Sequence, residues 1–205
     1  MCSYCKRINA SVDAKKIEQI MEKYKGRGIW VWKLIMKRLG SLYLEGNSTY
    51  IKTYEWMDED LKYLEGIYNE VRNAVNEELD KKLETMEYSY FGRIYGIKYG
   101  DKSEFEWHKD DLGDNEIRII FTIKARGKCG ILKYKTDLGE IQDVQNIEGK
   151  GVIIRGATTE HKVEPGEDES ERWVLIFTYT EDVNKRRFCI SDFLFKIERV
   201  YRQLI

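Results

Sequence analysis

The chain has 205 residues, enough for one large domain or for one domain with a substantial extension. Its apolar fraction of 42% and aromatic fraction of 13% exclude a disordered chain, and its formal net charge of −1 gives no overall attraction to nucleic acid. The N-terminus lacks the apolar stretch of a signal peptide and no apolar run is long enough to span a membrane, so we expect a cytoplasmic or nuclear protein with reduced cysteines.

The N-terminal part carries two cysteines and a helical pattern. Cys2 and Cys5 form a Cys-x-x-Cys pair, but no second pair or nearby histidine completes a zinc site. We therefore expect a frayed, reduced tail ahead of a redox or metal role. Apolar residues then recur at helical spacing over residues 11–38, with Ser11 in position to cap the helix. Two glycines interrupt this pattern, and the apolar run after them fits a second helix or a strand.

Another helix is expected from Asp58, which stands where an N-cap is needed, to about Leu79. Its apolar residues repeat at 3.6-residue spacing and its other face is acidic, so we interpret it as a surface helix packed on a sheet. The chain closes with a further amphipathic helical pattern, for which Ser191 is the expected N-cap.

From Tyr88 onward the sequence changes to short β-rich runs separated by glycine-containing turns. Short strands in regular succession predict an antiparallel sandwich or jelly roll. We therefore expect an α+β fold in a single domain, with a helical part over residues 1–87 packed on a β core over residues 88–205 that ends in the C-terminal helix. The expected strands are residues 90–99, 105–110, 117–124, 130–135, 141–145, 151–155 and 172–180.

The two histidines of the chain point to a metal site. His108 and Asp110 are two residues apart, so on an extended strand both side chains point to the same face. His161 would come from a distant strand of the same sandwich. Two imidazoles and one carboxylate on one face of an iron leave three positions open, which is the triad of non-haem Fe(II) oxygenases. A lone His-x-Asp is weak evidence, so the prediction rests on its conjunction with His161 and with Arg172, which opens the next strand.

Arg172 would supply a fixed cation beside this metal. A 2-oxo acid cosubstrate chelates iron through its 2-oxo group and adjacent carboxylate, and its far carboxylate needs a cation, for which the bidentate fork of arginine is suited. Among neighbouring residues, we expect Trp107 to point away from the site into the core. Glu106 would face the metal, where it orients a ligand or contacts substrate. Arg155 faces either substrate or solvent.

Four segments carry a family resemblance: Tyr99-Gly with His108-Lys-Asp, Cys129-Gly-Ile-Leu, Gly151-Val-Ile-Ile-Arg-Gly, and His161-Lys-Val-Glu-Pro with Arg172-Trp. Together, over residues 88–182, they resemble the double-stranded β-helix core of the Fe(II)/2-oxoglutarate oxygenases, and most of all the prolyl hydroxylases. The resemblance implies a hydroxylase that uses Fe(II), 2-oxoglutarate and O2, with ascorbate as an optional addition. It makes His108, Asp110 and His161 the catalytic iron ligands, Arg172 the 2-oxoglutarate anchor, and Tyr99 and Thr122 further contacts to that cosubstrate.

The sequence also departs from the family patterns. Cys129 replaces the first glycine of a Gly-Gly pair, and Arg172 stands where many prolyl hydroxylases have lysine. The AlkB-type nucleic-acid demethylases resemble the chain less well, because they have a second arginine where this chain has Thr178.

A peptide or protein side chain is the expected substrate, and three alternatives stay open. The first is an oxygenase that acts on a nucleic-acid base, because residues 6–45 hold ten Lys or Arg against four acidic residues, with Trp30 and Trp32 interleaved. Packing against the acidic helix explains this charge as well. The second is a non-catalytic binding module of the same fold, and the third is a cupin-like metalloenzyme that does not use 2-oxoglutarate.

Overall fold

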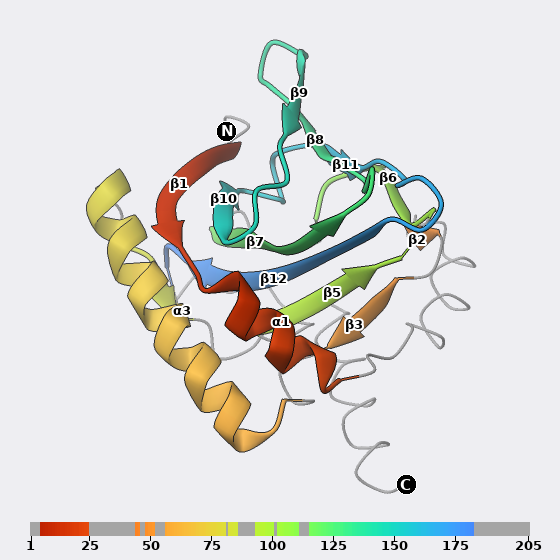
Figure 1. The fold of residues 1–205 in the computed structure, drawn as a ribbon. Helices are drawn as coiled ribbons and strands as arrows, with labels where there is room; N and C mark the ends of the chain where they lie inside the picture. Colours follow the sequence, from red (N-terminus) through yellow and green to blue (C-terminus); the bar gives the residue numbers. More distant parts are fainter. Residues whose placement is uncertain are drawn as a thin grey trace, which may run out of the picture.

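Two antiparallel β-sheets face one another, and two helices cover the outer surface of the larger sheet (Figure 1). The structure is a computed structural model, which describes residues 5–24, 44–45, 48–51, 56–80, 82–85, 93–100, 102–110 and 115–182. None of the helices that it describes has the length and apolar character needed to cross a bilayer.

The larger sheet has the strand order β1-β10-β7-β12-β5-β3, and β4 also pairs with β12. The long strand β12 lies between β7 and β5 and is antiparallel to both, so it forms the centre of the sheet. The strands are β1 (Cys5–Ser11), β3 (Thr49–Ile51), β4 (Glu84–Thr85), β5 (Ile94–Tyr99), β7 (Glu116–Arg126), β10 (Lys150–Ile154) and β12 (Glu171–Thr180).

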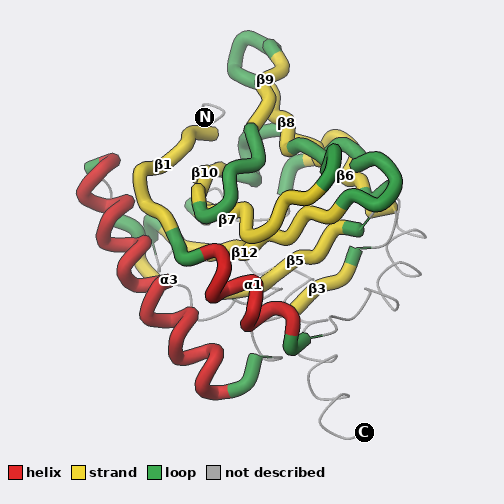
Figure 2. The backbone as a smooth tube through the Cα atoms, viewed as in Figure 1, coloured by secondary structure: helices red, strands yellow, loops and turns green. Residues whose placement is uncertain are grey.

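The smaller sheet has the strand order β2-β6-β11-β8-β9. Its strands are β2 (Leu44–Glu45), β6 (Glu104–His108), β8 (Leu132–Lys135), β9 (Ile141–Val144) and β11 (His161–Val163). From β5 to β12 the chain passes back and forth between the two sheets, as the drawing in Figure 2 shows. These eight strands form the double-stranded β-helix, or jelly roll, that the sequence predicted.

The hydrophobic core has two layers, because side chains alternate across the larger sheet. Leu175 and Phe177 of β12 point toward the helices and belong to one cluster, which we call the helix-facing layer. Val174 and Ile176 belong to the other cluster, the inter-sheet layer, which lies between the two sheets. The candidate site residues are found on this second side.

The two helices of the described chain are α1 (Ala14–Glu22) and α3 (Asp58–Leu79). The side chain of Asp13 caps α1 by accepting from the Lys16 N–H, so the expectation of Ser11 as the cap was wrong. Helix α3 begins where the sequence predicted, although the N-cap is Met57. Its apolar face is confirmed by the buried residues Leu64, Tyr68, Val71 and Val75.

The prediction of a frayed N-terminal tail was wrong for residues 5–11, which form β1. This strand pairs antiparallel with β10, and the edge of β10 that β7 does not use supplies its hydrogen-bond partners. Ile8 on β1 is buried in the helix-facing layer. Burial raises the pKa of the Cys5 thiol to about 12, although Arg7 lowers it. A thiol that stays protonated is a poor nucleophile and metal ligand. Cys2 lies outside the described residues.

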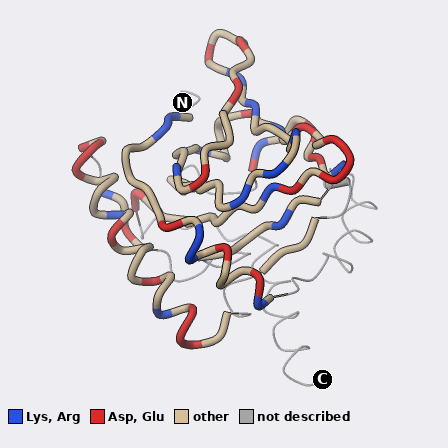
Figure 3. The backbone as a smooth tube through the Cα atoms, viewed as in Figure 1, with Lys and Arg blue, Asp and Glu red and all other residues tan. Residues whose placement is uncertain are grey.

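The seven strands predicted from the sequence are confirmed, with ends that differ by at most four residues. Strand β11 was missed because three residues are too few to show an alternating pattern. The helical pattern from residue 25 onward, Trp30 and Trp32, and the expected C-terminal helix lie outside the described residues. Charged residues of both signs are spread along the helices and loops (Figure 3).

Candidate metal centre

Three potential metal ligands meet where β6 and β11 pair. His108 ends β6, His161 begins β11, and the two are register partners in the smaller sheet. Oδ1 of Asp110 lies 3.9 Å from Nε2 of His108 and 3.8 Å from Nε2 of His161. One ligand atom of each residue lies within 4.8 Å of the others, a spacing close to what a metal with bonds of about 2 Å requires. The structure therefore brings the three predicted residues together.

Hydrogen bonds to the main chain orient both imidazoles. Nδ1 of His108 lies 2.6 Å from the carbonyl oxygen of Glu106, and Nδ1 of His161 lies 2.9 Å from that of Thr159. Because a carbonyl oxygen only accepts hydrogen bonds, each Nδ1 carries a proton, which leaves Nε2 as the nitrogen that can bind a metal. The two Nε2 atoms are the ones that approach Asp110. Hydrogen bonds of this kind fix the tautomer and ring orientation of metal-ligating histidines.

Asp110 lies two residues past the end of β6, so the expectation that it shares a strand with His108 was wrong. It reaches the site because its N–H donates to the carbonyl oxygen of Gly156 at 2.9 Å. Nη1 of Arg118 donates to its Oδ1 at 2.6 Å. Its Oδ2 is buried and has no hydrogen-bond partner among the described residues. A buried carboxylate oxygen without a partner is costly, and a metal ion would satisfy it.

The charge states suit a cation. Burial raises the pKa of the Asp110 carboxyl. Arg118 and the two histidines together lower it by more than burial raises it, so the pKa lies below its ordinary value. Burial lowers the pKa of His108, and the neighbouring His161 lowers it again. At neutral pH the site therefore offers one ionised carboxylate and a neutral His108 imidazole, which are the forms that bind metals.

Arg172, at the start of β12, is a buried cation. Its side chain is 4% exposed, and burial lowers its pKa from the ordinary arginine value. Its guanidinium carbon lies 5.2 Å from the ring centroid of Tyr99, its register partner on β5. Nε donates to Oδ1 of Asn146 at 2.8 Å. No carboxylate pairs with Arg172 in the part of the chain that the structure describes, so its positive charge is available to an anion.

A series of rings connects Arg172 to the three potential ligands. Tyr99 lies 6.0 Å from Phe105 between centroids, Phe105 lies 5.5 Å from His108, and His108 lies 4.4 Å from His161. Thr122 is buried on β7 opposite Val174, which places it on the inter-sheet side of the larger sheet. The structure thus brings Arg172 and Tyr99 together, and it places Thr122 on the same side of the larger sheet.

Several residues that hold the site were not among those predicted from the sequence. Arg118 had a signal in the sequence, because it is a lone charge inside the apolar run of a predicted strand. Its contact with Asp110 shows that it faces the inside of the sandwich. Gly156 had none that distinguishes it from a turn glycine. A Cβ at Gly156 would lie 1.7 Å from Oδ2 of Asp110, so only glycine leaves room for that carboxylate. Asn146 and Thr159 contribute through positions that only the folded chain reveals.

Two expectations about neighbouring residues were wrong. The side chain of Glu106 is exposed, and its main-chain carbonyl rather than its carboxylate orients His108. Trp107 is half-buried outside both core layers, with Nζ of Lys135 at 4.7 Å and of Lys162 at 5.4 Å from its ring centroid. It lies there because the described helices cover only the larger sheet (Figure 1).

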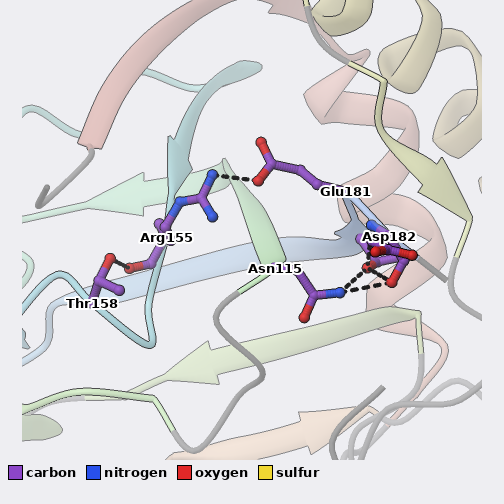
Figure 4. A network of polar contacts seen from close by, with 6 residues as sticks. Asn115, Arg155, Thr158, Glu181 and Asp182 are labelled. Atoms are coloured by element: carbon purple, nitrogen blue, oxygen red, sulfur yellow. Dashed lines mark hydrogen bonds and ion pairs between the residues drawn. The ribbon is translucent and has the colours of Figure 1, made fainter. Parts of the chain in front are cut away.

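A polar network fastens the turn that carries Gly156 and Thr159 (Figure 4). Nη2 of Arg155 donates to Oε2 of Glu181 at 2.5 Å, just past the end of β12. The carbonyl oxygen of Arg155 accepts from the N–H groups of the two threonines that follow in the turn. Asn115 joins the same end of β12 through Thr180 Oγ1 at 2.7 Å. Arg155 is therefore a structural residue of the turn that positions Asp110 and His161.

No protein-family model matches the sequence, and no curated protein sequence does. Solved structures share its fold. A prolyl-4-hydroxylase from Pseudomonas putida is 16% identical with a TM-score of 0.56, covering 90% of this chain and 93% of that chain. A prolyl hydroxylase from Trichoplax adhaerens, in complex with a peptide fragment of the hypoxia inducible factor oxygen degradation domain, is 11% identical with a TM-score of 0.56, covering 86% and 83%. HygX from Streptomyces hygroscopicus, with nickel and 2-oxoglutarate bound, is 10% identical with a TM-score of 0.55, covering 88% and 84%. These likenesses confirm the expected double-stranded β-helix fold.

Proposed function

We propose that this protein is an Fe(II)- and 2-oxoglutarate-dependent dioxygenase that hydroxylates a peptide or protein side chain. The observation that carries the proposal is the arrangement of His108, Asp110 and His161, in which Oδ1 of Asp110 lies 3.9 Å from Nε2 of His108 and 3.8 Å from Nε2 of His161. Arg172, which is buried and has no acidic partner in the described chain, lies on the side of the larger sheet that faces the smaller sheet. A triad with a nearby cation is what such chemistry needs.

Each residue has a defined part in this proposal. His108, Asp110 and His161 would hold Fe(II), and Gly156 and Arg118 keep the carboxylate in place. Arg172 would bind the far carboxylate of 2-oxoglutarate, with Tyr99 and Thr122 beside it. When bound, Fe(II) and 2-oxoglutarate supply the oxidising chemistry, in which O2 is consumed, the 2-oxo acid is decarboxylated and a substrate C–H bond is hydroxylated. The buried apolar side chains of the inter-sheet layer would keep water away from the site.

The choice of a peptide or protein substrate is supported by the fold shared with the two prolyl hydroxylases, one of which has a peptide bound. Residues 25–43 of the basic segment that favoured nucleic acid, with Trp30 and Trp32, lie outside the described residues. No described contact favours a nucleic-acid base as the substrate.

The test is a thermal-shift titration with Mn(II), with and without 2-oxoglutarate. A ligand that binds only the folded state raises the melting temperature. We expect Mn(II) to stabilise the wild type, 2-oxoglutarate to add stability only when the metal is present, and His161→Ala to lose both effects. Lys109→Ala is the matched control, because this exposed side chain lies between two ligands and should change neither effect.

Each failure has a separate meaning. If metal binds and 2-oxoglutarate adds nothing, the assignment of Arg172 fails and a cupin-like metalloenzyme is favoured. If neither binds, the oxygenase proposal fails altogether. If both bind and succinate release occurs with no peptide but with oligonucleotides, the substrate class is wrong.

A further inference from the structure

Asn146 is the residue that fixes the direction of the Arg172 side chain. It is half-buried in the loop that follows β9, and its Oδ1 accepts a hydrogen bond from Nε of Arg172 at 2.8 Å. This is a side-chain contact between two segments 26 residues apart in the sequence. Neither residue contacts His108, Asp110 or His161 through a described hydrogen bond.

The amide of Asn146 is itself held by the start of the β8 segment. Its Nδ2 donates to the carbonyl oxygen of Gly130 at 2.9 Å and to Sγ of Cys129 at 3.4 Å. Because the carbonyl oxygen can only accept, the NH2 group must face Gly130, and the oxygen of the amide must face Arg172. The orientation of the amide therefore leaves one arrangement for the arginine.

The backbone that holds Asn146 has little room to move. A Cβ at Gly130 would lie 1.9 Å from the carbonyl oxygen of Glu164, so this glycine is packed directly against the chain that follows β11. Gly166 lies on the other side of this contact, and a Cβ there would lie 3.1 Å from the Gly130 nitrogen. Asn146 thus connects Arg172 to a close-packed crossing of two main-chain segments.

This contact determines what Arg172 can offer a ligand. Asn146 engages Nε, and the side chain of Tyr99 lies beside the guanidinium and hydrogen-bonds to it, so the Nη hydrogens that Tyr99 does not use remain for an anion. The neutral amide satisfies Nε without neutralising the charge, which a carboxylate in its place would do. An arginine held in one direction also loses less side-chain entropy when it binds an anion.

We propose that Asn146 is a positioning residue that holds the Arg172 guanidinium ready for the far carboxylate of a dicarboxylic 2-oxo acid. This inference rests on the proposed function, because it concerns the same cosubstrate. Asn146 acts through Arg172 and does not touch the metal ligands.

The experiment measures the Kd of 2-oxoglutarate by calorimetry on Mn(II)-loaded wild type, Asn146→Ala and Asn146→Asp, with Gln142→Ala as the control. Gln142 is an exposed amide on the neighbouring strand β9 and should leave the Kd unchanged. We expect Asn146→Ala to raise the Kd about tenfold to a hundredfold, the range for a lost hydrogen bond to a charged group. Asn146→Asp keeps the size and the acceptor but pairs with Arg172, so it should raise the Kd at least as much.

Oxalate separates positioning from a general loss of structure. This two-carbon dicarboxylate chelates a metal through the same kind of oxygen pair but is too short to need a distant arginine. Its Kd, and the Kd of Mn(II) alone, should be the same in the wild type and both Asn146 variants. A parallel loss of oxalate binding would overturn the positioning role in favour of a structural one.

The remaining outcomes distinguish the two proposals. If the wild type binds Mn(II) but not 2-oxoglutarate, the proposed function fails and this inference fails with it. If the wild type binds 2-oxoglutarate and Asn146→Asp binds it equally well, the function stands and the role of Asn146 is overturned. Asn146→Asp keeps this test available even if Asn146→Ala does not fold.

Discussion

Along strand β12, side chains alternate between the helix-facing layer and the inter-sheet layer, and both sets are buried. Leu175 and Phe177 on the helix-facing side have no exposed surface and belong to the apolar cluster of that layer. Arg172 and Thr178 on the other side are 4% and 1% exposed, and they share that face with Val174 and Ile176. The second face of the same strand thus buries polar groups among apolar ones.

The difference shows how stability and function are divided in this fold. Apolar burial is non-directional, so the helix-facing layer depends on volume and tolerates changes that preserve it. A buried charge needs specific partners, which Asp110 and Arg118 find in each other and Arg172 finds in part in Asn146. Changes in the first layer should therefore alter stability alone, and changes in the second should alter binding.

The largest expected effect on stability comes from Phe177→Ala. Phe177 is fully buried and makes edge-to-face contacts with Tyr68 at 5.4 Å and Phe121 at 5.7 Å between ring centroids. Its removal leaves a cavity and should lower the free energy of unfolding by about 3–5 kcal/mol. Urea denaturation measures this loss. The Kd of Mn(II), measured at a temperature where the variant stays folded, should not change, and a changed Kd would contradict the division between the layers.

Gly156→Ala should show the opposite pattern, a loss of metal affinity. The added Cβ would lie 1.7 Å from Oδ2 and 2.5 Å from Cγ of Asp110, so the carboxylate must leave its position beside the two histidines. Loss of a group that positions a metal ligand costs about tenfold to a hundredfold in metal affinity. Calorimetric titration with Mn(II) checks this. Gly66→Ala makes the same chemical change in α3, where nothing lies within 4 Å, and should leave the Mn(II) affinity unaltered.

The same division explains what the sequence could predict. The apolar face of α3 was predicted from its 3.6-residue spacing, and the strands β5, β7, β10 and β12 from β-rich runs bounded by glycine-containing turns. The residues of the candidate metal centre were predicted from the conjunction of His108 and Asp110 with His161 and Arg172.

What the sequence could not predict depends on contacts between distant segments. Asp110 reaches the site through the carbonyl of Gly156 and through Arg118, not through strand geometry. Asn146 meets Arg172 only because the loop after β9 lies beside the start of β12. Strand β1 exists because β10 presents an edge, which no local pattern in residues 5–11 reveals. Such contacts are properties of the fold, and propensity does not register them.

A smaller effect on stability is expected at Asp60, in the first turn of α3. Lys23 Nζ donates to its Oδ1 at 2.8 Å, and Tyr24 donates to its Oδ2 at 2.7 Å. Burial raises the pKa of this carboxyl. The hydrogen bonds from Lys23 and Tyr24 together lower it by more than burial raises it, so the pKa lies below the ordinary 3.8. A lowered pKa in the folded state means that the unfolded chain takes up the proton first, and stability falls as the pH drops below about that value.

Asp60→Asn should therefore lower the free energy of unfolding by about 1 kcal/mol at pH 7, because the charge-assisted bond from Lys23 is lost. The variant should also lose less stability than the wild type between neutral pH and pH 3. Urea denaturation across that range measures both. Identical pH profiles for the two proteins would show that Asp60 is not ionised differently in the folded state. The Mn(II) affinity should be the same in both, since Asp60 belongs to the helices.

The smallest expected effect is a gain. Gly66 lies in the middle of α3, is exposed, and an added Cβ there would meet nothing within 4 Å. Glycine costs a helix interior about 1 kcal/mol relative to alanine, because it has more backbone freedom to lose on folding. Gly66→Ala should therefore raise the free energy of unfolding by about 0.5–1 kcal/mol in urea denaturation. A loss of stability would mean that the outer face of α3 is covered, since only a contact there could oppose the gain in helix propensity.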